Sequence, residues 1–503
     1  MSGSEGSQVA TPKFVGVETE FGITVTGGAE VNPVVASSLV VGAYRGSGRR
    51  DVRWDHTDEH PLRDARGYEH PDPHEPYPDD ELGLANTVLT NGARFYVDHA
   101  HPEYATPECS NARDLVIWDK AGERILEDAA TQAELTLPQG SRVLIHKNNT
   151  DGKGAAYGTH ENYLMPRSVP FGRLTRELLP FFVSRLVYVG AGRIGSEFKD
   201  AGTPYQLSQR ADFFEVEVGL ETTLKRPLMN TRDEPHADPE RYRRIHVING
   251  DANLCEVATY LKVGTMLLLL DVIEDEALPS LPGLAEPVAA FHQVSHDLTC
   301  AVPLRLEDGS TMTPLEIQWH YLDACKRYVK EREIEDDVTA DVLDRWEAVL
   351  ATAERDPRAL AGQVDWATKL DLIENYRDRH GLDWDHDRLK MVDLQYHDVR
   401  QDKGLYQRLA ARARVERLVS DAEVDAATTT PPEDTRAWFR GECIRRFRDQ
   451  VVAAGWDALI FDVGRDALQR VPMMEPGRGT RAMVEPLFEQ VSSAEELLDA
   501  LTT

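Results

Sequence analysis

The first regular pattern in the chain is an alternation of apolar and polar residues from Phe14 to Val25. In the run FVGVETEFGITV every second residue from Val15 onward is apolar, with one threonine as the exception. Side chains of a β-strand point alternately to its two faces, so the run predicts a half-buried strand. Its polar face carries Glu18 and Glu20 together.

A second strand is predicted within the run NGARFYVDHAHPEYATPE, residues 91–108. Phe95 and Val97 point towards a core, and the residues between and beside them form a polar stripe on the other face. The stripe consists of a cation, a phenol and a carboxylate: Arg94, Tyr96 and Asp98. A turn carrying His101, Glu103 and Thr106 is expected to follow.

Beyond these strands, helices and strands alternate along the chain. Apolar residues recur at helical spacing over 115–133, 254–275 and 315–330, and shorter apolar runs predict strands over 142–147, 214–220 and 243–248. The stretch 337–418 is helical in pattern and strongly charged. The chain is therefore expected to be a mixed helix and sheet protein.

Two changes in composition suggest how the chain is divided. Residues 45–81 are rich in Asp, His, Pro and Arg and nearly empty of aliphatic residues, which predicts a long mobile insertion loop. We expect it to gate access to the site rather than to build it; a tolerated surface insertion is the alternative. A linker over 425–433 then separates a catalytic domain, 1–430, from a small C-terminal domain, 431–503, with a helix over 435–453, a strand over 458–463 and a final helix.

Composition narrows the possible classes of function. The 503 residues carry a formal net charge of −30, which disfavours generic binding to nucleic acid or anionic membranes. The basic residues are 12 lysines and 44 arginines, and arginine suits bidentate contacts to carboxylate and phosphate. Five scattered cysteines, with no zinc-ligand spacing, and no apolar run long enough to span a bilayer predict a cytoplasmic protein with reduced thiols.

The polar strand faces are the candidate chemical sites. Two glutamates about 7 Å apart on one strand repel each other unless a cation lies beside them, and hard oxygen ligands on a rigid strand suit Mg²⁺. In the second strand, Arg94 can bind a phosphate, Asp98 can act as base or nucleophile, and Glu103 can supply another metal ligand. The alternatives are a solvated strand face for the glutamates and a structural ion-pair cluster for the second strand.

Three further polar runs could line a site or serve as turns: KNNTD (147–151), GTHEN (158–162) and NTRDEPH (230–236). The last one precedes the strand that contains Arg244 and His246. A lone histidine such as His160 or His246 is more often structural than a ligand. The chain has no Walker loop, no GxGxxG after a strand and no GxSxG elbow, so bound ATP would not be held by a Walker motif.

These motifs, in this order, resemble the family formed by the Pup ligase and the Pup deamidase/depupylase. The resemblance rests on GVETEFG (16–22), the run 91–108, KNNTD, HENYL (160–164), LSQRA (207–211), NTRDEPHAD (230–238) and YRRIHVINGDAN (242–253). It implies an α+β fold: a glutamine-synthetase-like curved β-sheet cradle packed with helices, plus the small C-terminal α/β domain. The long insertion, with its PLRDARGY stretch (61–68), is typical of the deamidase/depupylase members, although GVETEFG is spelled as in the ligases.

The resemblance also implies roles for individual residues. Asp98 matches the catalytic carboxylate. Glu18, Tyr96 and Glu103 match metal-binding positions, with Glu20 beside them on the same face. The nucleotide-binding positions are matched by Arg94, Thr106 and Trp456, the last of which could equally be a buried aromatic of the small domain.

The implied reaction is hydrolysis of a side-chain amide, with ATP and Mg²⁺ bound as cofactors. The enzyme would deamidate the C-terminal Gln of the modifier Pup to Glu and cleave the Pup–lysine isopeptide bond of pupylated proteins, in a pathway linked to the bacterial proteasome. Asp98 would attack the carbonyl directly or activate a water or a phosphate. Two other hypotheses stay open: a Pup–protein ligase that consumes ATP, and a Pup- or nucleotide-binding regulator without turnover.

Overall fold

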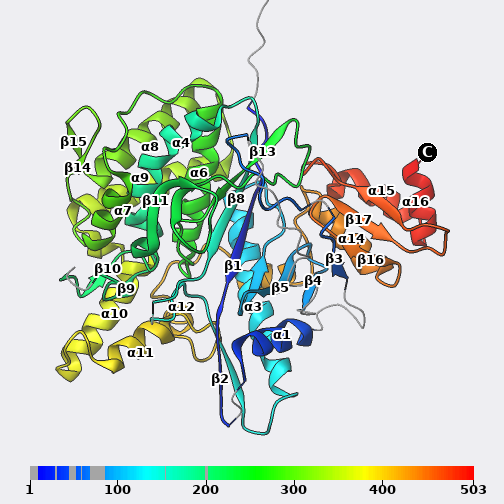
Figure 1. Ribbon diagram of the computed structural model, residues 1–503, viewed down its shortest axis with the longest axis horizontal. Helices are drawn as coiled ribbons and strands as arrows, with labels where there is room; N and C mark the ends of the chain where they lie inside the picture. Colours follow the sequence, from blue (N-terminus) through cyan, green and yellow to red (C-terminus); the bar gives the residue numbers. More distant parts are fainter. Residues whose placement is uncertain are drawn as a thin grey trace, which may run out of the picture.

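The computed structural model describes residues 10–28, 31–44, 52–57, 59–67, 85–152, 154–198 and 202–502. Its centre is a six-stranded antiparallel sheet in the order β13-β8-β1-β6-β5-β4 (Figure 1). The strands are β1 (Val15–Glu20), β4 (Asn86–Val88), β5 (Arg94–Asp98), β6 (His101–Ala105), β8 (Thr159–Pro166) and β13 (Tyr242–Val247).

The sequence pattern places both early motifs on strands, but it misjudges how they end. The run 14–25 divides after Glu20, because β2 (Gly22–Thr26) leaves the central sheet and pairs with β7 (Arg142–His146) in a separate ribbon. The predicted turn around Glu103 is wrong. Residues His101–Ala105 form β6, which pairs with β1 on one side and β5 on the other.

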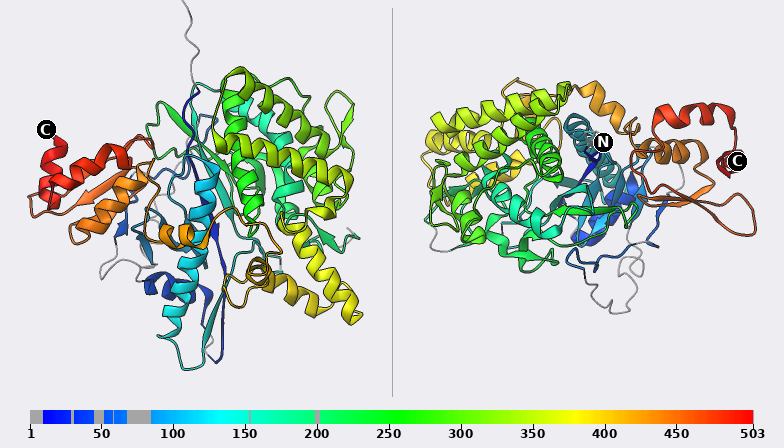
Figure 2. Two further views of the ribbon diagram at one scale, coloured as in Figure 1. Left: turned by 180° about the vertical axis from the view of Figure 1, so that it is seen from behind. Right: turned by 90° about the horizontal axis from the view of Figure 1, so that it is seen from above.

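One face of the central sheet is apolar and covered by helices. Val15 and Val17 of β1 pack with Ile245 of β13 and with α3 (Ala112–Glu134) and α6 (Glu256–Glu274) in the main core. From behind, α3 lies across the sheet (Figure 2). The opposite face carries the polar side chains, as the alternation of the strands requires.

Most of the remaining helices form a body beside β13 (Figure 1), whereas α1 and α13 pack on α3. α6 is buried on nearly all sides, which explains its almost uninterrupted apolar sequence. The helices are α1 (Pro33–Ala43), α4 (Phe171–Ser184), α5 (Leu186–Val189), α7 (Pro287–His296), α8 (Pro314–Glu331), α9 (Asp337–Arg355), α10 (Asp365–His380), α11 (Asp387–Tyr396), α12 (Leu405–Ala410) and α13 (Asp421–Ala427). Two 3₁₀ turns, Ala211–Phe213 and Pro357–Leu360, and three small ribbons complete this body: β9 (Arg193–Ile194) with β10 (Tyr205–Gln206), β11 (Phe214–Gly219) with β12 (Arg226–Asn230), and β14 (Leu304–Arg305) with β15 (Thr311–Met312).

The C-terminal part packs against the β4 edge of the molecule (Figure 1). It contains α14 (Ala437–Phe447), β16 (Val451–Ala454), β17 (Ala458–Phe461), β18 (Gln469–Pro472), α15 (Arg481–Gln490) and α16 (Ala494–Thr502). The helix expected over 435–453 is therefore too long, because Val451–Ala454 forms a strand. The predicted α+β class, a sheet packed with helices plus a small C-terminal part of helices and strands, is confirmed. The domain division at residue 430 stays a prediction.

The insertion supplies a strand to the C-terminal sheet. β3 (Arg53–Trp54) pairs in parallel with β16, and the sheet order is β18-β17-β16-β3. Val52 and Trp54 belong to the hydrophobic core of the C-terminal part. The prediction of a long loop over 45–81 is therefore wrong for Arg53–Trp54, and residues 45–51, 58 and 68–81 of it lie outside the described residues.

All five cysteines are free and buried. Among the helices of the described residues, none is both long and apolar enough to cross a membrane.

Candidate functional site

The polar face of the central sheet brings the predicted strand residues together. Glu20 pairs with Glu103, which pairs with Tyr96. Glu18 pairs with Ala105, which pairs with Arg94. Directly paired residues of an antiparallel sheet point to the same side, so the two strand motifs share one surface.

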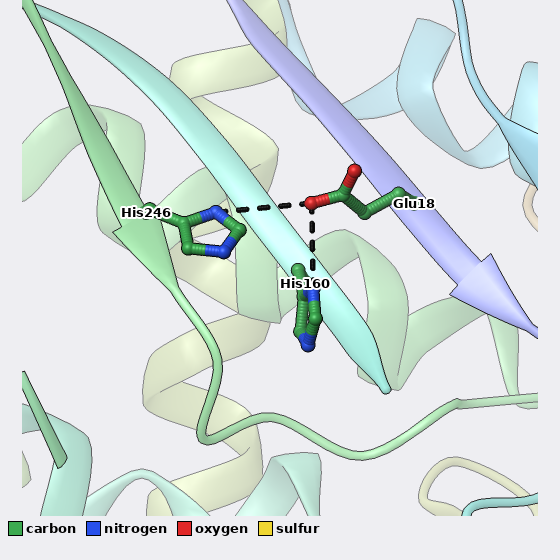
Figure 3. Close-up of side chains that lie close together, drawn as sticks. All are labelled: Glu18, His160 and His246. Carbon is green, nitrogen blue, oxygen red and sulfur yellow. Dashed lines mark ion pairs between the residues drawn. The ribbon is translucent and has the colours of Figure 1, made fainter. Parts of the chain in front are cut away.

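Glu18 lies against two histidines from neighbouring strands (Figure 3). Its Oε1 is 3.3 Å from Nδ1 of His160 on β8 and 3.7 Å from Nδ1 of His246 on β13. Burial would raise the pKa of Glu18, but the hydrogen bond from His160 and the neighbouring positive charges outweigh it, so its pKa lies far below the usual range. Glu18 is therefore ionised at neutral pH.

The two histidines belong to the site rather than to the core, contrary to the usual structural role of a lone histidine. One carboxylate oxygen of Glu18 and one nitrogen from each ring lie within 4.8 Å of one another, close enough to hold a metal ion. His246 Nδ1 donates to Asn162 Oδ1 at 2.8 Å, while its buried Nε2 has no partner in the described part of the chain. The sequence could have placed His246 on a polar strand face, because residues 244–247 alternate between polar and apolar, but the three consecutive polar residues 160–162 give no such signal for His160.

Both carboxylate oxygens of Glu20 accept a hydrogen bond. Oε1 accepts from the backbone N–H of Gly158 at 2.6 Å, and Oε2 accepts from Nδ1 of His101 at 2.9 Å. A Cβ at Gly158 would lie 2.8 Å from Glu20 Oε1 and 2.5 Å from His160 Nε2, so this approach requires glycine. Glu20 is thus fixed by the protein itself, which sets it apart from Glu18.

Asp98 is the most accessible carboxylate of the predicted set, with 35% of its side chain exposed. Its Oδ2 accepts from Nδ1 of the next residue, His99, at 2.8 Å. Burial opposes ionisation of Asp98, but the hydrogen bond and charge of His99 keep its pKa below the usual range. His99 has a φ of 51°, an uncommon left-handed conformation for histidine. The carboxylate is therefore charged and oriented.

Glu103 experiences the accumulated negative charge of this surface. It is buried, and burial together with the charges of Asp98, Glu18 and Glu20 raises its pKa well above the usual range. Burial and the charge of Glu103 likewise raise the pKa of Tyr96. Glu103 thus lacks the neighbouring positive charge that Glu18 and Asp98 have.

This donor set fits a hard divalent cation. Carboxylate and phenol oxygens are ligands that Mg²⁺ accepts, and a cation among them would relieve the repulsion that, together with burial, raises the pKa of Glu103. Glu18, Tyr96 and Glu103 can supply the oxygens, and His160 and His246 each bring a ring nitrogen within 4.8 Å of a carboxylate oxygen of Glu18.

A cavity opens beside this surface, between the sheet and the C-terminal part. Its volume is about 630 Å³, including space open to solvent, and its lining contains Glu18, Thr106, Arg244, Arg436 and Trp456. Thr106 Oγ1 accepts from the backbone N–H of Val17 at 3.0 Å, which fixes the threonine at the cavity wall. Two of the three predicted nucleotide residues, Thr106 and Trp456, therefore line one cavity, and Arg94 is the strand neighbour of its lining residue Ala105.

A buried ion cluster joins the sheet to the C-terminal part, and the sequence analysis did not identify it. Glu108 accepts from Arg436 Nε at 2.6 Å and from both terminal nitrogens of Arg440. Arg440 also donates to the backbone oxygens of Gly92 and Trp456. Burial would raise the pKa of Glu108, but the two guanidinium groups lower it to about 2. The cluster fixes the position of Trp456.

The other polar runs divide between site and scaffold. His160, Asn162, Arg244 and His246 face the site, as described. Lys147 instead lies buried at the back, where its Nζ is 2.6 Å from Asp119 and 3.0 Å from Glu123. It belongs to a structural ion cluster.

Two curated relatives match the chain along nearly its whole length, and a third matches about three quarters of it. A depupylase of Acidothermus cellulolyticus is 55% identical over 500 residues, 97% of this chain and 99% of the relative. A Pup deamidase/depupylase of Mycobacterium tuberculosis is 49% identical over 501 residues, with the same coverage. A Pup–protein ligase of Acidimicrobium ferrooxidans is 46% identical over 370 residues, 73% of this chain and 81% of the relative.

Two solved structures of a related ligase have the same fold as this chain. The ligase PafA in complex with Pup superposes with a TM-score of 0.79 at 33% identity, covering 97% of this chain and 94% of that chain. PafA in complex with ADP superposes with a TM-score of 0.73 at 36% identity, covering 84% of this chain and 95% of that chain. The family model described as Pup-ligase protein matches residues 13–460. This chain therefore belongs to the Pup-ligase protein family.

Proposed function

We propose that this chain is a Pup deamidase/depupylase: an amidohydrolase that converts the C-terminal Gln of Pup to Glu and cleaves the isopeptide bond between Pup and a substrate lysine. The observation that supports it most is the 55% identity with a depupylase over 97% of the chain. Identity with the ligase relatives is lower: 46% over 370 residues for one and 38% over 484 residues for another. The polar sheet face is consistent with chemistry at a side-chain amide.

The proposed roles follow from the environment of each residue. Both reactions occur at the same side-chain carbonyl carbon and differ in the leaving group, ammonia or a lysine amine. Asp98 is charged, partly exposed and oriented by His99, as a carboxylate needs to be to attack that carbon or to take a proton from the attacking oxygen. Arg94 and Arg244 supply positive charge near the oxygen that becomes negative.

The proposed cofactors are ATP and Mg²⁺. The ADP complex of the related ligase supports nucleotide binding, and the cavity beside Trp456 and Thr106 is the proposed location. Mg²⁺ would be held by Glu18, Tyr96 and Glu103, with Glu20 adjacent, and would supply Lewis-acid stabilisation of developing negative charge when bound. The proposed partners are Pup and pupylated proteins in the cytoplasm, with a link to the bacterial proteasome implied by the family resemblance.

The test is an amidase assay with Pup ending in Gln, ATP and Mg²⁺. We expect ammonia release, the small mass increase of an amide-to-acid conversion, and release of free protein from a purified Pup conjugate. Consumption of ATP with attachment of Glu-ended Pup to a protein, and no ammonia, would instead establish the ligase reaction. Nucleotide binding with neither reaction would establish a regulator without turnover.

Removal of one metal ligand should weaken cation binding specifically. We expect Glu103→Gln to lower the affinity for Mg²⁺ by about tenfold or more, because one of the few oxygen donors becomes a neutral amide. Titration with Mn²⁺ as a paramagnetic substitute measures the affinity directly. Glu215→Gln, on the exposed surface of β11, is the matched control. Equal affinities in the two variants would refute the assignment of Glu103.

A further inference from the structure

The insertion reaches the proposed nucleotide side of the site through Trp54. The strand position of Trp54 is fixed from two directions: Asp55 N–H donates to Ala454 O at 2.9 Å, and Val88 N–H donates to Val52 O at 3.1 Å. The indole lies edge-on to Trp456, with ring centroids 5.2 Å apart. Trp54 thereby extends the aromatic wall that Trp456 begins.

Arg94 is clamped between two aromatic rings. Its guanidinium carbon lies 4.1 Å from the ring centre of Trp54 and 3.8 Å from that of Tyr96, and Nε donates to Asn86 at 3.2 Å. Within the described residues its terminal nitrogens donate no hydrogen bond. A guanidinium held in one plane with free N–H groups is pre-organised to bind an anionic oxygen pair.

Glu59, also from the insertion, occupies the place next to this guanidinium. Its Oε1 is 3.9 Å from Arg94 Nη1, too far for a hydrogen bond but close enough for an ion pair, and both side chains are largely buried. Oε1 accepts from Trp54 Nε1 at 2.6 Å, and Oε2 accepts from His56 Nδ1 at 2.9 Å. Burial alone would raise the pKa of Glu59, but these hydrogen bonds and Arg94 lower it to about 2, so the group is charged.

The segment that carries Glu59 is also anchored on its other side. Ala65 N–H donates to Thr231 O at 2.7 Å, Asp233 N–H donates to Arg63 O at 2.9 Å, and Asp64 accepts from the Thr231 hydroxyl at 2.7 Å. The position of Glu59 beside Arg94 is therefore built into the fold. Trp54 and Glu59 of the insertion thus lie against a proposed site residue, and the expectation that the insertion gates the site stays a prediction.

We propose that Glu59 competes with the phosphate groups of the nucleotide for Arg94. This competition sets how tightly the site binds the nucleotide. The inference rests on the proposed function in so far as Arg94 is taken as a nucleotide ligand. A carboxylate 3.9 Å from the guanidinium partly neutralises it and repels an incoming polyanion. A bound phosphate must therefore displace Glu59 or share Arg94 with it.

The test compares the nucleotide affinities of two glutamate variants in the full-length protein by calorimetry, with Mg²⁺ and without Pup. Glu59→Gln keeps an oxygen for Trp54 Nε1 but removes the charge. We expect it to bind ADP and ATP about three- to tenfold more tightly than the unmodified chain and to bind adenosine, which has no phosphate, with unchanged affinity. Glu489→Gln, on the exposed side of α15, is the control and should match the unmodified chain.

Two results would overturn the proposal: unchanged or weaker binding of ADP and ATP by Glu59→Gln, or an equal gain for adenosine, which would indicate a change in the base pocket instead. The proposed function has a separate readout. Failure of the unmodified chain to release ammonia from Gln-ended Pup refutes the hydrolase but leaves the nucleotide comparison valid. Conversely, an active hydrolase with no affinity difference refutes only the role of Glu59.

Discussion

Replacement of Asp98 by asparagine should reduce hydrolysis of Gln-ended Pup by about 10³-fold while leaving the nucleotide affinity within about threefold. The amide has nearly the shape of the carboxylate and can still contact His99, but it cannot attack the carbonyl carbon or accept a proton from the attacking oxygen. Ammonia release under saturating substrate measures the first quantity, and calorimetry measures the second.

The matched control for this substitution is Asp308→Asn, in the exposed turn between β14 and β15, which should retain full activity. Retention of more than about one tenth of the activity by Asp98→Asn would remove Asp98 from the catalytic role. Loss of nucleotide binding together with activity would point instead to a structural role for Asp98 on the polar face of the sheet. The two measurements together separate chemistry from folding.

Replacement of Glu108 by glutamine should lower the free energy of unfolding by about 3 kcal/mol. The substitution leaves Arg436 and Arg440 buried without their counter-charge, and it loosens the Arg440 contact to the backbone of Trp456. Denaturant unfolding, followed by tryptophan fluorescence, measures the loss. The affinity for nucleotide should fall as well, because Trp456 lines the cavity.

A surface ion pair provides the control for Glu108. Glu423 pairs with Arg113 at 2.6 Å, but both side chains are more than one third exposed, so Glu423→Gln should cost at most about 1 kcal/mol. Equal losses in the two variants would contradict the assignment of Glu108 as a buried connection between sheet and C-terminal part.

The dependence of stability on pH gives a second check on Glu108. Its pKa is about 2 in the folded chain, below the usual value of 4.5. A depressed carboxyl pKa stabilises the folded state above the unfolded pKa, and this contribution, about 3 kcal/mol, is lost as the pH falls from about 4.5 to about 2. The Glu108→Gln variant should therefore lose less stability over this pH range than the unmodified chain.

The sequence by itself determined which residues of a single strand lie on the same face of that strand. Alternation is a local property with a period of two, so the shared faces of Glu18 with Glu20, and of Arg94 with Asp98, could be predicted without any knowledge of partners. Long helices such as α3 and α6 were predicted from another local property, the recurrence of apolar residues at helical spacing. The predicted ends of strands were less reliable, because hydrogen bonding to neighbouring strands decides where a strand ends. Glu103 is on a strand only because β1 and β5 lie on either side of it.

Only the tertiary structure decided which distant segments complete the site. His160 and His246 join Glu18 across strand pairs that no local pattern specifies, and Glu108 meets two arginines more than 300 residues away. The clearest case is the insertion. Its composition predicts a loop because it lacks aliphatic residues, yet Trp54 and Glu59 lie against Arg94, since pairing with β16 and contacts to 231–233 supply the ordering that its own sequence cannot.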